Sequence, residues 1–201
     1  MNQPVDDVRT RILQEATRLF AERGSSTPIQ AIADAAGITK PTLVYHFGSK
    51  KGLREAVFAE FMNHWRDELP RLMGAAASID TLLRALFDFF RRDPYRARLL
   101  LREALDRPGK LREELRHSIQ PFTALLTQAI RVGQAGGQLR EVIDPEAYVV
   151  LVISAAVGVV AVGEQVGGLI APEPTVDAQQ RELIRMARTA LLNPPSTPSG
   201  D

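Results

Sequence analysis

The stretch from Gly37 to Arg54 carries the side chains best suited to binding chemistry. Its basic residues, with no acidic residue among them, are Lys40, Lys50, Lys51 and Arg54. Its neutral hydrogen-bonding residues are Thr39, Thr42, Tyr45 and His46. Groups of both kinds can contact the phosphates or the base edges of nucleic acid. The alternative interpretation is a solvated basic turn on a helical protein.

Two short helices and the start of a third are expected to hold these residues. We expect Thr27 to cap the first short helix and Thr39 to cap the second. Gly37 lies between them and tolerates the left-handed backbone that a tight turn requires. This arrangement predicts a helix-turn-helix. Lys50 and Lys51 then begin a longer helix, where an anion would meet both lysines and free N–H groups.

A 3.6-residue apolar period continues through most of the chain and predicts an all-α fold of about nine helices. Pro70 is expected to bend or end the helix that begins at Lys50. A long apolar stripe runs from Leu111 to Ile130, and Pro121 predicts a kink within it. Asp144 is expected to cap a later helix, with proline in its first position. We divide the chain into domains at residues 1–52 and 53–192, followed by a disordered Pro/Ser-rich tail at 193–201.

The composition excludes several classes of protein. The 201 residues include no cysteine, which rules out disulfides, thiolate metal sites and a cysteine nucleophile. Basic and acidic residues number 25 and 24. This near-zero net charge excludes a protein that coats nucleic acid through its overall positive charge. The first 55 residues nevertheless hold eight basic and six acidic residues. The N-terminal residues lack the pattern of a secretory signal, and we expect a cytoplasmic protein.

Residues 147–163 form a run of seventeen residues without a charge. A transmembrane helix would normally need about twenty apolar residues and basic flanks, whereas the flanks here are acidic. A buried strand is a second alternative, because the run is rich in valine. The Asp144 cap favours a helix, and a helix that is apolar all round is normally buried on all sides. We therefore predict a core or dimer helix, with no membrane partner.

Metal binding and catalysis have little support in the sequence. Glu114 and His117 match one half of a di-iron bundle signature, but no second Glu-x-x-His occurs, and Glu60 and His64 are four residues apart. The polar face of an amphipathic helix explains this pair equally well. No catalytic triad, phosphate-binding loop or dinucleotide signature is present. We assign no catalytic residue, metal ligand or cofactor.

The segment TRILQEATRLFAERGSSTPIQAIADAAGITKPTLVYHFGSKKGLREAV, residues 10–57, resembles the DNA-binding domain of TetR-family transcriptional regulators. The matching elements, in the same order and spacing, are Ala33, Ala36-Gly37, Thr42-Leu43, Tyr45-His46-Phe47 and Ser49-Lys50. The resemblance implies that the second short helix enters the major groove of a double-stranded DNA operator. The implied DNA contacts are Thr27, Thr39, Lys40, Thr42, Tyr45, His46 and Lys50. Val44 departs from the family, which often has an aromatic phosphate contact there, so this role is either lost or falls to Tyr45.

The resemblance also implies a C-terminal bundle that binds a small-molecule effector and forms a homodimer through the last two helices. The apolar excess of the bundle favours a mainly hydrophobic effector. The candidate ligand-binding residues are Phe89, Phe90, Arg102, Phe122, Leu126, Ile130, Ile153, Ser154 and Val157, although core packing explains each of them equally well. The expected function is a ligand-responsive repressor, in which the long fourth helix and Pro121 carry the change that releases DNA. An enzyme built on the bundle and a ligand carrier with a vestigial head are the rival interpretations.

Overall fold

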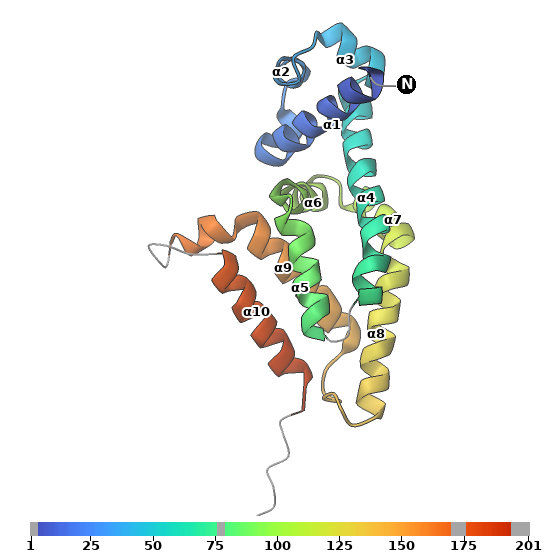
Figure 1. Ribbon diagram of the computed structural model, residues 1–201, viewed down its shortest axis with the longest axis vertical. Helices are drawn as coiled ribbons and strands as arrows, with labels where there is room; N and C mark the ends of the chain where they lie inside the picture. Colours follow the sequence, from blue (N-terminus) through green and yellow to red (C-terminus); the bar gives the residue numbers. More distant parts are fainter. Residues whose placement is uncertain (1–3, 76–78, 170–175, 194–201) are drawn as a thin grey trace, which may run out of the picture.

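The computed structural model describes residues 4–75, 79–169 and 176–193 (Figure 1). Within these ranges the chain forms ten α-helices, one short 3₁₀ helix and no β-strand. The all-α prediction is confirmed, with one helix more than the expected nine. The elements are α1 (Pro4–Arg23), η1 (Gly24–Ser26), α2 (Ile29–Ala35), α3 (Lys40–Phe47), α4 (Lys50–Ala75), α5 (Ile79–Arg91), α6 (Pro94–Asp106), α7 (Pro108–Ser118), α8 (Gln120–Ala135), α9 (Pro145–Gly167) and α10 (Val176–Leu191).

Helices α1 to α3 and the start of α4 form a small head at one end of an elongated molecule (Figure 1). Apolar residues at helical spacing on α1 face the other three helices and are buried with them. Ala33 on α2 is fully buried, and its small side chain allows the neighbouring helices to approach closely. The buried apolar residues of the head are Ile12, Leu13, Ala16, Leu19, Phe20, Ala21, Ile32, Ala33, Ala36, Leu43, Leu53 and Val57.

Helix α4 begins in the head and continues into the bundle formed by α5 to α10 (Figure 1). It runs through Pro70 as far as Ala75, so this proline lies inside the helix and does not end it. The domain boundary predicted at residues 52 and 53 falls in the first turn of α4. That division stays a prediction, since one continuous helix crosses it.

Helix α9 lies at the centre of the bundle and packs against α5, α6, α8 and α10. Asp144 caps it as predicted, because its Oδ1 accepts a hydrogen bond from Ala147 N at 2.9 Å. Tyr148 donates from its hydroxyl to Ala187 O at 2.9 Å and ties α9 to α10. Burial in this setting raises the pKa of Tyr148 to about 12.

The apolar stripe from Leu111 to Ile130 belongs to two helices, which corrects the predicted kink. Helix α7 ends at Ser118, and α8 begins at Gln120, with Ile119 between them. Pro121 lies in the first turn of α8, where the missing N–H of proline removes no helical hydrogen bond. Residues 194–201 of the predicted disordered tail lie outside the described residues.

Candidate nucleic-acid interface

A tight turn sets the angle between α2 and α3. Gly37 has a φ of 66°, in the left-handed region that glycine adopts without strain. Ile38 N donates to Ala33 O at 3.0 Å across this turn. Thr39 caps α3 as predicted, since its Oγ1 accepts from Thr42 N at 3.3 Å and lies 2.9 Å from Thr42 Oγ1. Two of the predicted DNA-contacting residues are therefore held together at the start of α3.

Helix α3 presents one face to solvent. Leu43 is fully buried and attaches the helix to the head core, so the opposite side is open. That open side carries Lys40, Val44 and Tyr45, and the Tyr45 side chain is 86% exposed. The apolar ring of an exposed tyrosine leaves water only when a partner docks on it, and its hydroxyl can then form a hydrogen bond with that partner. His46 is half-buried, with its ring 5.5 Å from that of Tyr45.

The start of α4 lies directly beside the end of α3. Ser49 Oγ accepts a hydrogen bond from Gly52 N at 3.1 Å and so caps α4. A Cβ atom at Gly52 would lie 2.2 Å from Phe47 O, so glycine permits this close approach. Lys50 and Lys51 occupy the first turn of α4, where the helix dipole is unfavourable to a cation and favourable to an anion. A phosphate there would be attracted by both lysines and by the helix terminus.

Thr27 is placed differently from the other predicted DNA contacts. It is buried. Its hydroxyl donates to Gly24 O of η1 at 2.8 Å and to Leu19 O of α1 at 3.3 Å. The expected cap of α2 is wrong, because Pro28 occupies the N-cap position and no side chain caps the helix there. The hydroxyl is used inside the head, so a phosphate contact from it would require these two hydrogen bonds to break.

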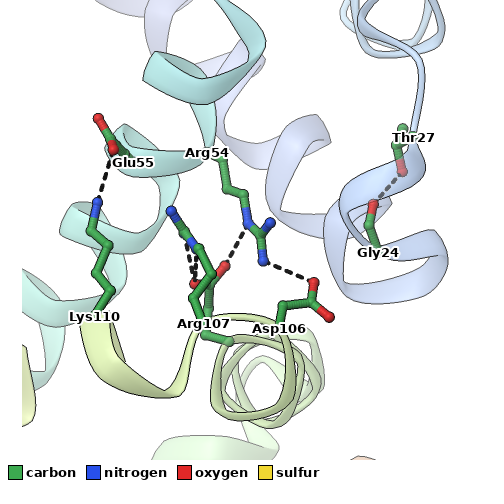
Figure 2. A network of polar contacts seen from close by, with 8 residues as sticks. Gly24, Thr27, Arg54, Glu55, Asp106, Arg107 and Lys110 are labelled. Carbon is green, nitrogen blue, oxygen red and sulfur yellow. Dashed lines mark hydrogen bonds and ion pairs between the residues drawn. The ribbon is translucent and has the colours of Figure 1, made fainter. Parts of the chain in front are cut away.

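Arg54, although only four residues after Lys50, belongs to a different network (Figure 2). Its Nε donates to Glu103 Oε1 at 2.7 Å, and its Nη2 donates to Asp106 Oδ2 at 2.9 Å. Arg107 approaches the other oxygen of Glu103, with Nη2 2.6 Å from Oε2. Glu103 is 1% exposed, so its charge depends on these two guanidinium groups. Arg54 therefore connects the head to the bundle, and the basic run available to a ligand is shorter than the sequence indicates.

A second contact attaches the head to α6. Arg102 donates from Nε to Ala21 O and from Nη2 to Glu22 O, both at 2.8 Å, and so satisfies carbonyl groups at the end of α1. A Cβ atom at Gly24, just after α1, would lie 3.0 Å from Arg102 Nη1. One turn earlier on α6, Arg98 donates to Ala161 O of α9 at 3.1 Å. Helix α6 thus contacts both the head and the central helix of the bundle.

The predicted ligand-binding residues do not form one group. Phe89 and Phe90 are buried, with their ring centroids 5.1 Å apart on α5. Ile130 and Val157 are also buried, while the half-buried candidates are Phe122, Leu126 and Ile153. Two candidates lie elsewhere: Ser154 is on the exposed face of α9, and Arg102 contacts α1.

Two features of the site were missed from the sequence. Trp65 and Phe61 pack on Phe89 and Phe90, with the Trp65 ring 4.9 Å from Phe89 and 5.0 Å from Phe90. Their i, i+4 spacing on α4 indicated only an apolar stripe. Glu103 was missed entirely, because a buried acidic residue within an amphipathic helix has no local sequence signal.

One face of α9 remains exposed in the single chain, so α9 is not a wholly buried core helix, and the alternative of a dimer helix stays a prediction. Val150 and Leu151 are 63% and 67% exposed, and the same face continues through Ser154, Val162 and Val166. Met186 of the neighbouring α10 is exposed as well. By length and composition α9 is the one helix in the described residues that could cross a membrane. Its other face packs on four helices of the bundle.

The half di-iron signature does not form a cluster of ligands. His117 is exposed, and its Nδ1 lies 2.9 Å from Glu113 O. His64 stacks on Phe89, with ring centroids 5.6 Å apart. Within residues 4–75, 79–169 and 176–193, no three His, Asp or Glu side chains lie close enough together to hold a metal ion.

Two family models match the chain. Residues 12–57 match the model described as "Bacterial regulatory proteins, tetR family", and residues 76–190 match "Tetracyclin repressor-like, C-terminal domain". Among curated proteins, the repressor KstR2 of Rhodococcus jostii is 31% identical over 96 residues, which cover 42% of this chain and 47% of that protein. The repressor Rv3405c of Mycobacterium tuberculosis is 39% identical over 82 residues, covering 40% and 42% of the two chains. These alignments span about half the length of the relatives.

Solved structures match over nearly the whole chain. A transcriptional regulator from Saccharomonospora viridis in complex with choline has a TM-score of 0.73 at 21% identity, covering 94% of this chain and 100% of that chain. FadR from Bacillus subtilis in complex with stearoyl-CoA has a TM-score of 0.65 at 16% identity, covering 90% and 98%. At these identities the structures show the fold alone. With both domains matched by family models, the chain belongs to the TetR family of bacterial transcriptional regulators.

Proposed function

We propose that this chain is a ligand-responsive transcriptional repressor that binds a palindromic operator in double-stranded DNA as a homodimer. The observation that carries the proposal is the open face of α3, where Tyr45 is exposed beside the lysines that begin α4. Thr39, Lys40, Thr42 and Tyr45 would contact bases or backbone in the major groove, and His46 and Lys50 would contact phosphates. Val44 cannot donate a hydrogen bond, so Tyr45 takes the role of the aromatic phosphate contact.

The exposed face of α9 supports dimerisation through α9 and α10. A patch of several large apolar side chains on a single chain is typical of a surface that another protein covers. Gly158 lies on this face, and a Cβ atom there would meet nothing within 4 Å in the single chain. A glycine costs stability inside a helix, and close approach of a second α9 would account for it. A DNA-binding dimer works in the cytoplasm, so we propose that a partner chain, not lipid, covers this face.

The aromatic and aliphatic side chains between α4, α5, α8 and α9 support a mainly hydrophobic effector. Two similar structures contain choline and stearoyl-CoA, respectively, so the fold accommodates small ligands in those proteins. We propose that the effector of this chain binds near Phe89 and Phe90 and lowers affinity for the operator. To release DNA, the effector needs to bind more tightly, by only a few kcal/mol, to a conformation in which the spacing of the two heads does not match the operator.

Helix α6 is the proposed route from the effector to the head. It contacts α9 through Arg98, the end of α1 through Arg102, and the start of α4 through Glu103. Arg102 and Glu103 are adjacent, so a shift of this turn of α6 would move both attachments of the head together. This replaces Pro121 as the carrier of the change, because Pro121 begins α8 and contributes no kink.

The salt dependence of DNA binding tests the proposed interface. Fragments of the source genome bound by the purified protein are titrated at several salt concentrations, and the affinity is expected to fall steeply as salt rises. Lys50→Ala should weaken binding to all bound fragments and reduce the slope of log affinity against log salt by about 0.9. Arg112→Ala removes the same charge from an exposed site on α7 and serves as the matched control. Equal effects of the two substitutions, or binding that is independent of salt, would contradict the proposal.

Sedimentation equilibrium tests the dimer. Leu151→Arg places a charge in the exposed apolar face of α9 and should convert a dimer into monomers at micromolar concentration. Leu105→Arg is the matched control, because Leu105 is 82% exposed on α6, outside this face. A wild-type monomer, or a dimer that survives Leu151→Arg, would refute the assignment of this surface.

A further inference from the structure

Trp65 is the single tryptophan of the chain, and its indole N–H has no hydrogen-bond partner among the residues that the structure describes. The residue lies on α4, in the bundle half of the helix, and is 3% exposed. Its Nε1 atom is buried and meets no acceptor in the part of the chain that the structure describes. The indole nitrogen can only donate a hydrogen bond, so it requires an acceptor atom. Buried polar groups in native proteins are nearly always hydrogen-bonded, and an exception requires an explanation.

The side chains that contact Trp65 are largely aromatic, and among the described residues none accepts a hydrogen bond from its Nε1. The Trp65 ring is 5.8 Å from Phe61, 4.9 Å from Phe89 and 5.0 Å from Phe90, and all three pairs meet edge to face. For a purely structural role, a phenylalanine would fill much of this space without burying a donor. The position therefore carries an indole whose N–H donates no hydrogen bond within the described residues.

We infer that the indole N–H of Trp65 donates a hydrogen bond to an oxygen of the effector, and that the effector joins such an acceptor to an apolar body. This inference rests on the proposed function, in which an effector binds near Phe89 and Phe90. A ketone, ester or carboxylate oxygen would satisfy the orphaned donor, while the aromatic side chains would bury the apolar part. Compounds without an acceptor would leave the N–H unpaired and bind more weakly.

The same cluster disfavours a quaternary ammonium ligand. Such cations are bound by open faces of several aromatic rings. Here the guanidinium carbon of Arg96 already lies 5.4 Å above the centre of the Phe89 ring, and His64 stacks on that ring as well. The rings of Phe61, Trp65 and Phe90 pack edge to face, so the edge of one ring covers part of the face of the next. The choline of the similar structure is therefore not the class of ligand that this cluster fits.

Nuclear magnetic resonance can test the hydrogen bond directly, because a chain with one tryptophan gives one indole N–H signal. The full-length ¹⁵N-labelled protein is titrated with two ketones, methyl naphthyl ketone and methyl undecyl ketone, and with naphthoate. The matched controls replace each ketone oxygen by a methylene group, and naphthyltrimethylammonium supplies the cation. At least one of the ketones should move the indole proton downfield and bind about tenfold to a hundredfold more tightly than its methylene control, while naphthoate is judged by the shift of the indole signal alone.

Trp65→Phe keeps an aromatic ring and removes the donor. The variant should bind the active ketone and its methylene control with equal affinity, as measured by calorimetry. If no acceptor compound moves the indole signal of the wild-type protein, or if ketone and methylene compounds bind equally to it, the inference is wrong. A stronger response to the ammonium compound would also overturn it. DNA binding is not part of either measurement, so this inference and the proposed repressor function fail or succeed separately.

Discussion

The first turn of α4 carries basic residues in two different environments. Lys50 and Lys51 begin the helix next to the end of α3, and Lys51 is exposed while Lys50 is half-buried. Arg54, one turn later, forms ion pairs with Glu103 and Asp106 of α6. The tyrosines show the same contrast, since Tyr45 is exposed on α3 and Tyr148 is buried with its hydroxyl hydrogen-bonded to Ala187 O.

This contrast separates groups that remain available to a partner from groups that hold the chain together. A charge at an exposed helix terminus is free to meet a phosphate, whereas a charge beside a buried carboxylate is needed where it is. The head therefore depends on both sets: one for contacting DNA and the other for its attachment to the bundle. Substitutions within each pair should affect different measurements.

The largest effect is expected from Glu103→Ala. Removing this buried carboxylate leaves Arg54 and Arg107 without their shared counter-charge, and the free energy of unfolding should fall by about 3 kcal/mol. Urea denaturation of the full chain measures the change. Glu55→Ala breaks the pair with Lys110, 2.9 Å apart, which is much more open to solvent than Glu103, and should alter stability far less. Similar losses of stability in the two variants would show that the ion pairs of Glu103 contribute no more to the free energy of unfolding than the pair of Glu55 with Lys110.

An intermediate effect is expected on the salt dependence of DNA binding when the charge of Lys50 is removed, with Arg54 as the comparison. Arg54→Gln should leave the slope of log affinity against log salt at its wild-type value, because Arg54 releases no counterions from DNA. Lys50→Gln, measured on the same fragment, should reduce that slope by about 0.9. If Arg54→Gln flattened the slope as much as Lys50→Gln, the distinction between the two residues would fail.

The smallest effect at neutral pH is expected at Tyr148. The pKa of this phenol is raised to about 12 in the folded chain, from an ordinary value of 10.0. Its contribution to stability is fully present below pH 10 and is lost as the pH rises from 10 to 12, where the unfolded chain ionises first. The loss amounts to at most about 3 kcal/mol.

Tyr148→Phe provides the control for this prediction. It removes the phenol and therefore this part of the pH dependence, at the cost of one hydrogen bond, about 1 kcal/mol at neutral pH. Denaturation curves of both proteins from pH 8 to pH 12 make the comparison. Parallel curves across that range would contradict the assigned pKa.

Local features of the fold could be predicted from the sequence. The caps at Thr39 and Asp144 and the turn at Gly37 depend on residues a few positions apart, and all three occur where expected. Thr27 was misplaced because a threonine before proline can also turn inward to bond with the preceding helix. The kink predicted at Pro121 is wrong because an apolar stripe keeps the same period whether it runs along one helix or along two consecutive helices.

Other features depend on contacts that sequence spacing does not encode. The partner of Arg54 lies 49 residues away on α6, so the sequence alone grouped it with the lysines. Arg102 and Ser154 were assigned to a ligand site because both are polar residues in an apolar region, whereas one contacts α1 and the other lies on the exposed face of α9. The importance of Trp65 rests on an indole N–H without a hydrogen-bond partner among the described residues, which depends on the three-dimensional packing.

Selection of DNA from a random duplex library by the purified protein tests the central claim most directly. A dimeric repressor that inserts α3 into two successive major grooves should enrich an inverted repeat, with half-sites about one helical turn or more apart. Tyr45→Ala, which changes an exposed side chain, should abolish or alter this enrichment while the unfolding temperature stays at the wild-type value. Failure of the wild-type protein to enrich any sequence, with the chain folded and dimeric, would contradict the account.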